Sequence, residues 1–407
     1  MFGAFGLLLG RVFGKWRPDM ELRERVMAYI DEHEREMIEL WKNLVQLESP
    51  SSDTERVAQA AAHLDTYCGA LGLCTKKYMF EHAGPSLAAW TKKGEFPGVA
   101  LMGHMDTVHK QGAFGDKVFR IEGENVHGPG VYDCKGGIAT AFFVIKALMY
   151  AGYDKRQLKI LLSGDEETAH SLSNGASLAM YKEGIQGCAA AFNCESGLLS
   201  GDVITERKGG GSLIFRVYGT AAHAGAAPQD GASAIKEAAR KILDIEALTD
   251  YNGTTFNCGT IKGGSGVNVI PDYCEFQVGI RFRSNEEERN ALKQLEDIAK
   301  RVYTEGVRTE MEAAAGFKAM EMTEKTEPLF EVYKNSCINL GYPVPHMVSS
   351  GGCSDGAYVA MEQVPVLCGV GVRGAHNHSK EEYAVIGSMK ERARILAETI
   401  LCLPDDF

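Results

Sequence analysis

Apolar residues recur at helical spacing near the start of the chain. This pattern runs through Leu22–Leu47 and predicts an amphipathic helix. A second helix is expected to begin at Ser52 or Asp53, either of which can cap its N-terminus, and to stop at Gly69 or Gly72. The chain therefore opens with helices rather than with a strand.

Short apolar runs bounded by glycine and proline come next. The runs at 86–93 and 98–106 are typical of strands, and 158–167 is typical of a central strand that enters a turn. Between them, residues 136–152 are apolar nearly throughout and predict a buried helix. Strands and helices alternate in this way up to about residue 200. Such alternation predicts an α/β fold with a parallel or mixed sheet that carries helices on both faces.

The pattern changes after residue 206. It then predicts a strand, a long amphipathic helix, two strands and another helix, at 208–221, 232–249, 256–264, 272–282 and 286–306. This β-α-β-β-α order is typical of a compact α+β unit with two layers. From about residue 316 the chain returns to a helix, a glycine-rich loop, a short strand and a final helix. We therefore expect a discontinuous α/β domain, 18–206 and 316–407, interrupted by a small α+β domain, 207–315.

Composition and charge narrow the class of protein. Hydrophobic residues make up 45% and charged residues 24% of the 407 residues, which excludes an intrinsically disordered chain. The formal net charge is −11, so the basic surface of a nucleic-acid-binding protein is missing. The eleven cysteines include no C-x-x-C pair, which favours reduced thiols in a cytoplasmic protein over a disulfide framework.

The N-terminal extension, residues 1–17, has no assigned role. Its apolar run is about ten residues long, with no basic segment before it and no typical cleavage site. A signal peptide, a frayed or misassigned start, and a weak amphipathic anchor with Arg11, Lys15 and Arg17 all stay open. No apolar run in the sequence approaches the roughly 20 residues of a membrane span.

Histidines and carboxylates follow several predicted strands. His104 and Asp106 leave one strand end on the same face, so the carboxylate can support a metal-bound imidazole. A polar loop is the alternative for this pair, and His109 is expected on the surface. Glu166 and Glu167 are adjacent at another strand end, where one can bind a metal and the other can act as general base. The alternative there is an acidic first turn of a helix.

Three further segments carry candidate ligands. Asp133 lies in a glycine-dense turn before a helix, where an isolated Asp is most often a turn or N-cap residue. Glu195 follows an apolar strand, and His376 and His378 precede an expected acidic helix start. Carboxylates and imidazoles gathered at strand ends, without a thiolate, suit zinc, cobalt or manganese in a hydrolytic site.

Seven motifs carry a resemblance to a known family. In chain order they are GHMDTV, GPGVYDCKGG, DEET, CESG, HAGAAPQDGASAI, SGGCSDGAY and HSKEEY. Over about residues 40–400 the chain resembles the di-zinc metallopeptidases that include carboxypeptidase G, the aminoacylases, acetylornithine deacetylase and succinyl-diaminopimelate desuccinylase. The closest likeness is to glutamate carboxypeptidases of the carboxypeptidase G type. Each motif alone is weak, and the ordered set is specific.

The resemblance implies a site for two zinc ions, with cobalt or manganese as substitutes. Asp133 would bridge the two ions, and its peptide bond with Cys134 would be cis. The other implied ligands are His104 and Glu195 for one ion, and Glu167 and His378 for the other. His376 stays the alternative to His378.

The same resemblance assigns roles around the metal ions. Glu166 would be the general base, and Asp106 would orient His104. The small domain would be a lid and dimerisation domain. From it His223 would reach the active site of the partner subunit and polarise the scissile carbonyl; a loop histidine that caps the next helix is the alternative.

The implied substrate site lies between the lid and a glycine-rich loop. Asn268 and Arg281 match lid positions that hold a substrate carboxylate, for which the guanidinium fork is suited. A structural salt bridge is the alternative for Arg281. Where the family often has a carboxylate two residues earlier, this chain has Gly279. The implied glycine-rich wall is Ser350, Gly351 and Gly352.

These implications predict hydrolysis of an amide bond next to a free carboxylate. Release of C-terminal glutamate from a peptide or folate-like conjugate is the first expectation, and deacylation of an N-acyl amino acid is the alternative. A non-catalytic metal-binding scaffold is the rival of another class, and the presence of every ligand and the base argues against it. The expected partners are a small peptide or N-acyl amino acid and, through the lid, a second copy of the chain. No nucleic acid and no membrane span are expected.

Overall fold

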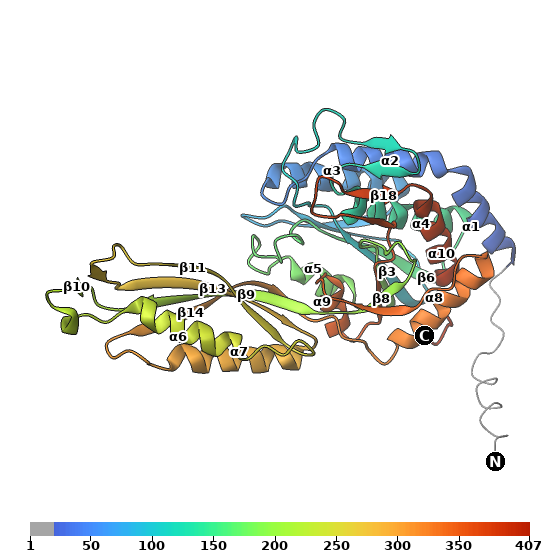
Figure 1. Cartoon of the computed structure of the whole chain (residues 1–407). Helices are drawn as coiled ribbons and strands as arrows, with labels where there is room; N and C mark the ends of the chain where they lie inside the picture. The colour runs from blue at the N-terminus through green and yellow to red at the C-terminus, as the bar shows by residue number, and fades with distance from the viewer. Residues whose placement is uncertain (1–19) are drawn as a thin grey trace, which may run out of the picture.

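A mixed sheet of eight strands lies at the centre of the larger part of the molecule (Figure 1). The computed structural model describes residues 20–407, and the N-terminal extension 1–17 lies outside them. In spatial order the strands are β1 (Cys74–Tyr78), β2 (Ser86–Trp90), β6 (Arg156–Ser163), β3 (Phe96–His104), β7 (Cys188–Asn193), β16 (Val366–Cys368), β8 (Val203–Arg207) and β15 (Met347–Ser350). The central strands β6, β3, β7 and β16 run parallel to one another. Strand β2 runs antiparallel to both of its neighbours, β6 and β1. The predicted α/β class with a mixed sheet is confirmed.

Helices cover both faces of this sheet, as predicted. Six of them share one apolar core with the sheet. They are α1 (Met20–Glu32), α2 (Glu34–Gln46), α3 (Thr54–Leu71), α4 (Gly136–Ala151), α8 (Thr326–Leu340) and α10 (Gly387–Leu401). Two shorter helices, α5 (Leu178–Gly184) and α9 (Gly356–Met361), belong to a second core. Successive residues of β3 alternate between the cores, with Leu101 in the first and Ala100 and Met102 in the second, so the cores lie on opposite faces.

Helix α4 lies deep in the first core. Together with the turn before it, Val131–Ala151 is the one described segment that is long and apolar enough to cross a membrane, and it is mostly buried inside the protein. Its first turn packs against the end of β7, where a Cβ on Gly137 would meet the carbonyl oxygen of Cys194 at 1.7 Å. Glycine is therefore required here, and the close approach brings the turn 131–135 next to the end of β7.

The first helices follow the prediction with one break. The expected run 22–47 is divided at His33, whose Nδ1 lies 2.9 Å from the carbonyl oxygen of Tyr29, and both halves bury apolar residues in the same core. The next helix, α3, is capped by Asp53, whose side chain accepts a hydrogen bond from the N–H of Arg56 at 3.2 Å. It ends at Gly72, which has a left-handed φ of 75°.

A second, antiparallel sheet extends away from the larger part (Figure 1). In spatial order its strands are β11 (Thr255–Gly263), β13 (Tyr273–Phe282), β9 (Gly209–Tyr218) and β14 (Arg308–Phe317). Helices α6 (Ala234–Glu246) and α7 (Asn285–Lys300) cover one face around a separate apolar core. We name residues 209–317 the second-sheet segment. Its limits lie close to the expected 207–315, and its role as a lid and dimerisation domain stays a prediction.

The sequence pattern does not predict β14, and it extends α7 too far. β14 is an edge strand with half-buried and exposed side chains, so it has no continuous apolar run. α7 ends at Lys300 because Arg301 has an extended backbone. The Lys241 ammonium of α6 also donates to the carbonyl oxygens of Ile298 (2.7 Å) and Ala299 (3.1 Å), and thereby satisfies the end of the helix.

Two smaller sheets complete the described chain. β10 (Ala222–His223) pairs with β12 (Val269–Ile270) at the far tip of the second-sheet segment (Figure 1). The other sheet contains β4 (Arg120–Glu122), β5 (Asn125–His127), β17 (Gly374–Ala375) and β18 (Tyr383–Val385). The helix start expected just after His378 is wrong, because Tyr383–Val385 pairs with β5 and β17 and α10 begins only at Gly387.

Candidate metal centre

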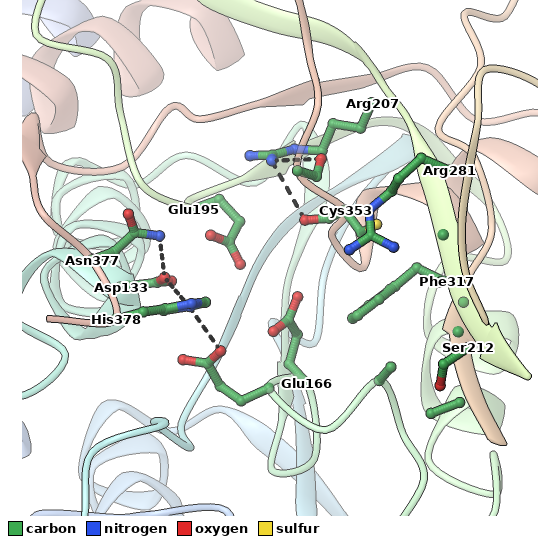
Figure 2. Close-up of a pocket in the computed structure, with 18 of the residues that line it drawn as sticks. Asp133, Glu166, Glu195, Arg207, Ser212, Arg281, Phe317, Cys353, Asn377 and His378 are labelled. Atoms are coloured by element: carbon green, nitrogen blue, oxygen red, sulfur yellow. Dashed lines mark hydrogen bonds and ion pairs between the residues drawn. The ribbon is translucent and has the colours of Figure 1, made fainter. Parts of the chain in front are cut away.

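Three parallel strands of the main sheet end at the same edge, and a candidate ligand lies at each end. His104 is the last residue of β3, Glu166–Glu167 follows β6, and Glu195 follows β7. Because these strands are parallel neighbours, their carboxyl ends lie side by side. Asp133 reaches this edge from the turn before α4, and His378 reaches it from the loop before β18 (Figure 2). The structure therefore brings all the implied ligands to one place.

His104 is almost fully buried, and both of its ring nitrogens face polar groups. Its Nε2 lies 3.1 Å from Oδ1 of Asp133 and 3.2 Å from Oε1 of Glu195. Its Nδ1 lies 3.0 Å from the main-chain oxygen of Asp106 and 3.5 Å from the carboxylate of the same residue. The main-chain oxygen, rather than the expected carboxylate, is thus the nearer partner. A proton on Nδ1 leaves Nε2 free to bind a metal ion.

The Asp106 carboxylate holds the two glutamates. It accepts hydrogen bonds from the N–H groups of Glu166 (3.2 Å) and Glu167 (3.1 Å) and from the hydroxyl of Ser51 (2.8 Å). Burial acts to raise the pKa of Asp106, but the hydrogen bond and charge of His104 outweigh it and hold the pKa below its usual value. Asp106 therefore connects His104 with the turn that carries Glu166 and Glu167.

Asp133 presents its two carboxylate oxygens to two different histidines. Oδ1 lies 3.1 Å from Nε2 of His104, and Oδ2 lies 3.3 Å from Nε2 of His378. Asn377, which is not among the predicted site residues, donates from Nδ2 to Oδ2 at 3.0 Å. The peptide bond between Asp133 and Cys134 is cis, as the resemblance implies. A carboxylate placed between two imidazoles is suited to being shared by two metal ions.

His378, and not His376, reaches the cluster. Nε2 of His378 lies 3.1 Å from Oε2 of Glu167, and the side chain is 54% exposed. The ring of His376 instead contacts the ring of Tyr383, with 5.9 Å between centroids. His378 therefore closes the cluster on the side that faces solvent.

The donor set fits divalent metal ions. Ligand atoms of His104, Asp133 and Glu167 all lie within 4.8 Å of one another, as do those of His104, Cys134 and Glu195. Imidazole nitrogens and carboxylate oxygens suit zinc, cobalt and manganese. Burial raises the pKa of the Cys134 thiol to about 12, and its Sγ accepts a hydrogen bond from the N–H of His104 at 3.1 Å.

Acidic side chains are concentrated in the cluster. Burial raises the pKa of Glu166 well above its usual value, and burial also raises the pKa of Glu167 to about 7. Hydrogen bonds to Asp133 and Glu167 raise the pKa of His378 to about 10. Buried carboxylates of this kind are stabilised by cations, which is the second reason why the residues fit a metal site.

Metal binding is expected to strengthen as the pH rises. When the pH is below the His378 pKa of about 10, this residue holds a proton that it must lose before Nε2 can bind a metal ion. Below pH 7 the Glu167 carboxylate also takes up a proton, since its pKa is about 7. We expect the apparent zinc affinity to rise about tenfold per pH unit between about pH 7 and 9. Competition with a zinc indicator at each pH measures this slope.

The neighbouring histidine supplies the control for this prediction. His378→Ala is expected to remove the pH dependence of the ion that His378 binds. His376→Ala is expected to keep it, because the ring of His376 faces Tyr383 instead of the cluster. A zinc affinity of the wild type that did not change with pH would contradict the assignment of His378 as a ligand.

A pocket of about 540 Å³ opens from the cluster towards the second-sheet segment (Figure 2). On that segment it is lined by Gly210, Gly211, Ser212, Gly279, Arg281, Ala315, Gly316 and Phe317. Of the expected glycine-rich wall, Gly352 lines the pocket and Ser350 and Gly351 do not. Ser350 supports the wall, since its hydroxyl accepts a hydrogen bond from the N–H of Gly352 at 3.2 Å.

Two arginines line this pocket without a carboxylate partner. Arg281 donates to the main-chain oxygen of Ile280 at 2.9 Å, and within residues 20–407 it forms no ion pair, so the salt bridge considered as its alternative is absent there. Arg207, which is not among the predicted site residues, is 8% exposed and donates to Sγ of Cys368 (3.1 Å) and to the carbonyl oxygen of Gly352 (3.1 Å). This end of the pocket is therefore positively charged.

His223 belongs to β10 at the far tip of the second-sheet segment (Figure 1), and neither it nor Asn268 lines the pocket of its own chain. Nδ1 of His223 accepts hydrogen bonds from the N–H groups of Gly225 (3.1 Å) and Ala226 (3.0 Å). These bonds agree with a local capping role and leave Nε2 free. The main-chain oxygen of Asn268 accepts from the N–H of Ala224 at 2.9 Å. The structure thus separates these two residues from the metal cluster.

A carboxylate outside the predicted set holds the turn of Asp133. Glu382 is fully buried and accepts hydrogen bonds from the N–H groups of Gly130 (3.2 Å), Tyr132 (2.9 Å) and Asp133 (3.1 Å). Nε2 of His109 lies 2.7 Å from the same carboxylate. His109 is therefore buried, and its prediction as a surface residue is wrong, because its partner lies 273 residues away in the sequence.

The fold and this site together define a metal-dependent hydrolase. Residues 100–401 match the model of peptidase family M20/M25/M40, and the chain belongs to this family. Carboxypeptidase G2 of Pseudomonas sp. (strain RS-16) is 28% identical, over 90% of this chain and 89% of that protein. Succinyl-diaminopimelate desuccinylase of Gluconobacter oxydans is 24% identical, over 76% of this chain and 82% of that protein. The crystal structure of aminopeptidase PepT from Bacillus cereus shares the fold, with a TM-score of 0.71 at 21% identity over 90% of this chain and 98% of that one. The predicted family and the prediction of an enzyme are confirmed.

Proposed function

We propose that this chain is a zinc carboxypeptidase that releases a C-terminal amino acid, glutamate or a similar residue. The observation that carries the proposal is the Arg281 guanidinium, which lines the pocket beside the metal cluster and pairs with no carboxylate of the described chain. A guanidinium holds a carboxylate through two parallel hydrogen bonds. Arg207 adds positive charge at the same pocket. The likeness to carboxypeptidase G2 supports the same substrate class.

Deacylation of an N-acyl amino acid is the second candidate. Its substrate also carries a free carboxylate next to the scissile amide, so Arg281 suits both reactions. The likeness to succinyl-diaminopimelate desuccinylase supports it. The two reactions differ only in the group on the acyl side of the amide, which is a peptide in one and a simple acid in the other.

Five side chains are proposed to hold two zinc ions. Asp133 would be shared, and the remaining ligands would be His104 and Glu195 for one ion and Glu167 and His378 for the other. When bound, zinc supplies a Lewis acid that polarises an amide carbonyl and lowers the pKa of water. Cobalt or manganese suits the same donors.

Glu166 is the proposed general base. It lines the pocket and belongs to neither group of candidate ligand atoms, so its carboxylate is free to exchange protons. Its N–H is held by Asp106 at 3.2 Å, which fixes the start of the side chain. Its raised pKa suits a group that takes a proton from water and then gives it to the leaving amine.

The second-sheet segment is proposed to act as a lid and to pair two copies of the chain. His223 lies at its tip, and neither His223 nor Asn268 lines the pocket of its own chain. The pocket of a partner is a place where these residues could meet substrate, and there Nε2 of His223 would polarise the scissile carbonyl. The mass of the chain in solution tests the pairing.

The state of the cysteines is related to the cellular compartment of the protein. All eleven are free in the structure, with no disulfide bond between them. Reduced thiols are typical of proteins in a reducing compartment. They support the proposed cytoplasmic location.

A panel of matched substrates tests the proposed function. The zinc-loaded protein is expected to release glutamate from peptidyl-glutamate, and to act at least about 100-fold more slowly on the same peptide with a C-terminal amide. Chelation is expected to abolish hydrolysis, and added zinc to restore it. Mass spectrometry of the products identifies the bond that is cleaved. A higher kcat/KM for acetyl-glutamate than for peptidyl-glutamate would favour the deacylase instead.

Arg281→Ala gives the residue-level test of this proposal. The variant is expected to raise KM for peptidyl-glutamate about 10–100-fold, because a charged hydrogen bond to the substrate carboxylate is lost. Arg283→Ala is the matched control, since Arg283 pairs with Glu287 at 3.3 Å and does not line the pocket. Equal rates on the free acid and the amide, or an unchanged KM in the Arg281 variant, would contradict the proposal.

A further inference from the structure

A second cluster of buried polar side chains lies close to the proposed general base. Nε2 of His170 is 2.6 Å from Oδ1 of Asp355, and Nδ1 of His170 is 2.8 Å from Oγ of Ser177. Tyr181 donates to the other carboxylate oxygen of Asp355. All four side chains are buried, and none lines the pocket or belongs to the groups of candidate ligand atoms.

The contacts from Ser177 to His170 and from His170 to Asp355 do not form a nucleophilic site. Ser177 has no exposed surface, so a substrate cannot reach its hydroxyl. That hydroxyl lies 2.8 Å from the hydroxyl of Ser173, within the same buried region. A serine hydrolase instead needs a hydroxyl that faces the substrate and an oxyanion hole. The cluster must therefore act through the segments that it joins.

The contact between His170 and Asp355 joins two loops of the active site. His170 belongs to the Glu166 loop, residues 164–177, which connects β6 with α5. Asp355 belongs to the glycine-rich loop, residues 350–355, whose Gly352 and Cys353 line the pocket. The two partners are 185 residues apart in the sequence. By contrast, the Asp165 carboxylate accepts from the N–H of Ser173 at 2.9 Å, which stays within the Glu166 loop.

The ring of His170 also meets the end of the second sheet. Its centroid lies 5.8 Å from that of Phe317, the last residue of β14, and 5.3 Å from that of Tyr358 in α9. The Tyr358 hydroxyl donates to the main-chain oxygen of Gly316 at 3.4 Å. One buried side chain therefore contacts the Glu166 loop, the glycine-rich loop and the strand that leads back from the second-sheet segment.

We propose that His170 is a positioning residue for Glu166. By binding Asp355 it holds the Glu166 loop against the glycine-rich loop, and Phe317 ties this arrangement to the second-sheet segment. The inference rests on the proposed role of Glu166. A displacement of a catalytic group by about 1 Å costs about 100-fold in rate. Arg281 binds the substrate carboxylate from a different element, so the effect falls on kcat rather than on KM.

Two substitutions of His170 separate its hydrogen bond from its packing. His170→Phe keeps a ring against Phe317 and Tyr358 and removes the bond to Asp355. It is expected to lower kcat about 10–100-fold, with KM changed less than about threefold and zinc content unchanged. His170→Gln keeps a donor near the position of Nε2 and is expected to retain kcat within about threefold.

A distant buried hydrogen bond supplies the matched control. Tyr333→Phe removes the contact of the Tyr333 hydroxyl with Arg392 (2.6 Å), between α8 and α10. This variant also loses a buried bond to a charged group, yet it is expected to keep kcat. If His170→Phe does not fold, Asp355→Ala removes the same bond from the other side and takes its place.

Amide hydrogen exchange gives a readout that does not depend on activity. In the full-length protein, with and without zinc, His170→Phe is expected to raise the exchange of residues 164–177 about tenfold, whereas Tyr333→Phe leaves it unchanged. Unchanged exchange, a loss of zinc in His170→Phe, or a His170→Gln variant as slow as His170→Phe would overturn the proposal. If exchange rises but the wild type hydrolyses no amide, the proposed function fails and the fixing of the loop by His170 stands.

Discussion

Replacement of Glu166 by glutamine is expected to lower kcat about 10²–10⁴-fold while the protein keeps its metal ions. Glutamine has nearly the same shape, so the hydrogen bond from the N–H of residue 166 to Asp106 (3.2 Å) is retained. The change removes only a carboxylate that can take up and return a proton. Since Glu166 is in neither group of candidate ligand atoms, the zinc content should not fall.

The test compares kcat with zinc content in the same preparation. Glu237→Gln is the matched control, because Glu237 is also buried but accepts from the N–H groups of Tyr303 (3.0 Å) and Thr304 (2.7 Å) in the second-sheet segment. It is expected to change stability and to leave kcat unchanged. A zinc-loaded Glu166→Gln variant with more than about a tenth of the wild-type kcat would exclude Glu166 as the base.

Replacement of Glu382 by alanine is expected to destabilise the protein by about 3–5 kcal/mol and to weaken zinc binding about 10–100-fold. The N–H groups of Gly130, Tyr132 and Asp133, and the ring of His109, all lose their acceptor. Each buried donor left without a partner costs about 1–3 kcal/mol. Because the three N–H groups belong to the turn that carries Asp133, the proposed bridging carboxylate loses its fixed position.

The adjacent glutamate provides the comparison. Glu381 is exposed, so Glu381→Ala is expected to change the free energy of unfolding by less than about 0.5 kcal/mol. Urea unfolding of the metal-free variants measures the stability, and zinc titration of the folded protein measures the affinity. Folded Glu382→Ala with the zinc affinity of the wild type would show that Glu382 does not position Asp133.

The candidate ligands were predicted from the family resemblance of the seven motifs, and a weaker local signal points the same way for three of them. His104, Glu167 and Glu195 each stand at the end of an apolar strand, and parallel neighbours bring such ends together. Among the residues that hold the ligands, Asp106 is marked by its spacing from His104, whereas nothing local marks Glu382. Glu382 is one of several charged residues in a polar stretch, and its partner His109 lies 273 residues away in the sequence. Arg207 was missed for the same reason, since its partners Cys368 and Gly352 are distant in the sequence.

The fold shows the same division between local and distant effects. The start and the end of helix α3 are both among the residues that the sequence offered (Ser52 or Asp53, and Gly69 or Gly72), because the cap, Asp53, and the stop, Gly72, each act within a single turn. Strand β14 was not predicted, because an exposed edge strand has little apolar pattern. The acidic segment after His378 was interpreted as a helix start, although pairing of Tyr383–Val385 with β5 makes it a strand.

The order of strands in the main sheet also sets when the site can form during synthesis. β16, residues 366–368, lies between β7 and β8, and His378 follows it. The centre of the sheet is therefore incomplete until nearly the whole chain has left the ribosome. The second-sheet segment has its own core, whose residues lie between Leu213 and Ala319, and it can fold earlier. In a chain truncated before residue 366, the second-sheet segment would thus fold while the metal site stays incomplete. Such a chain is expected to have no activity.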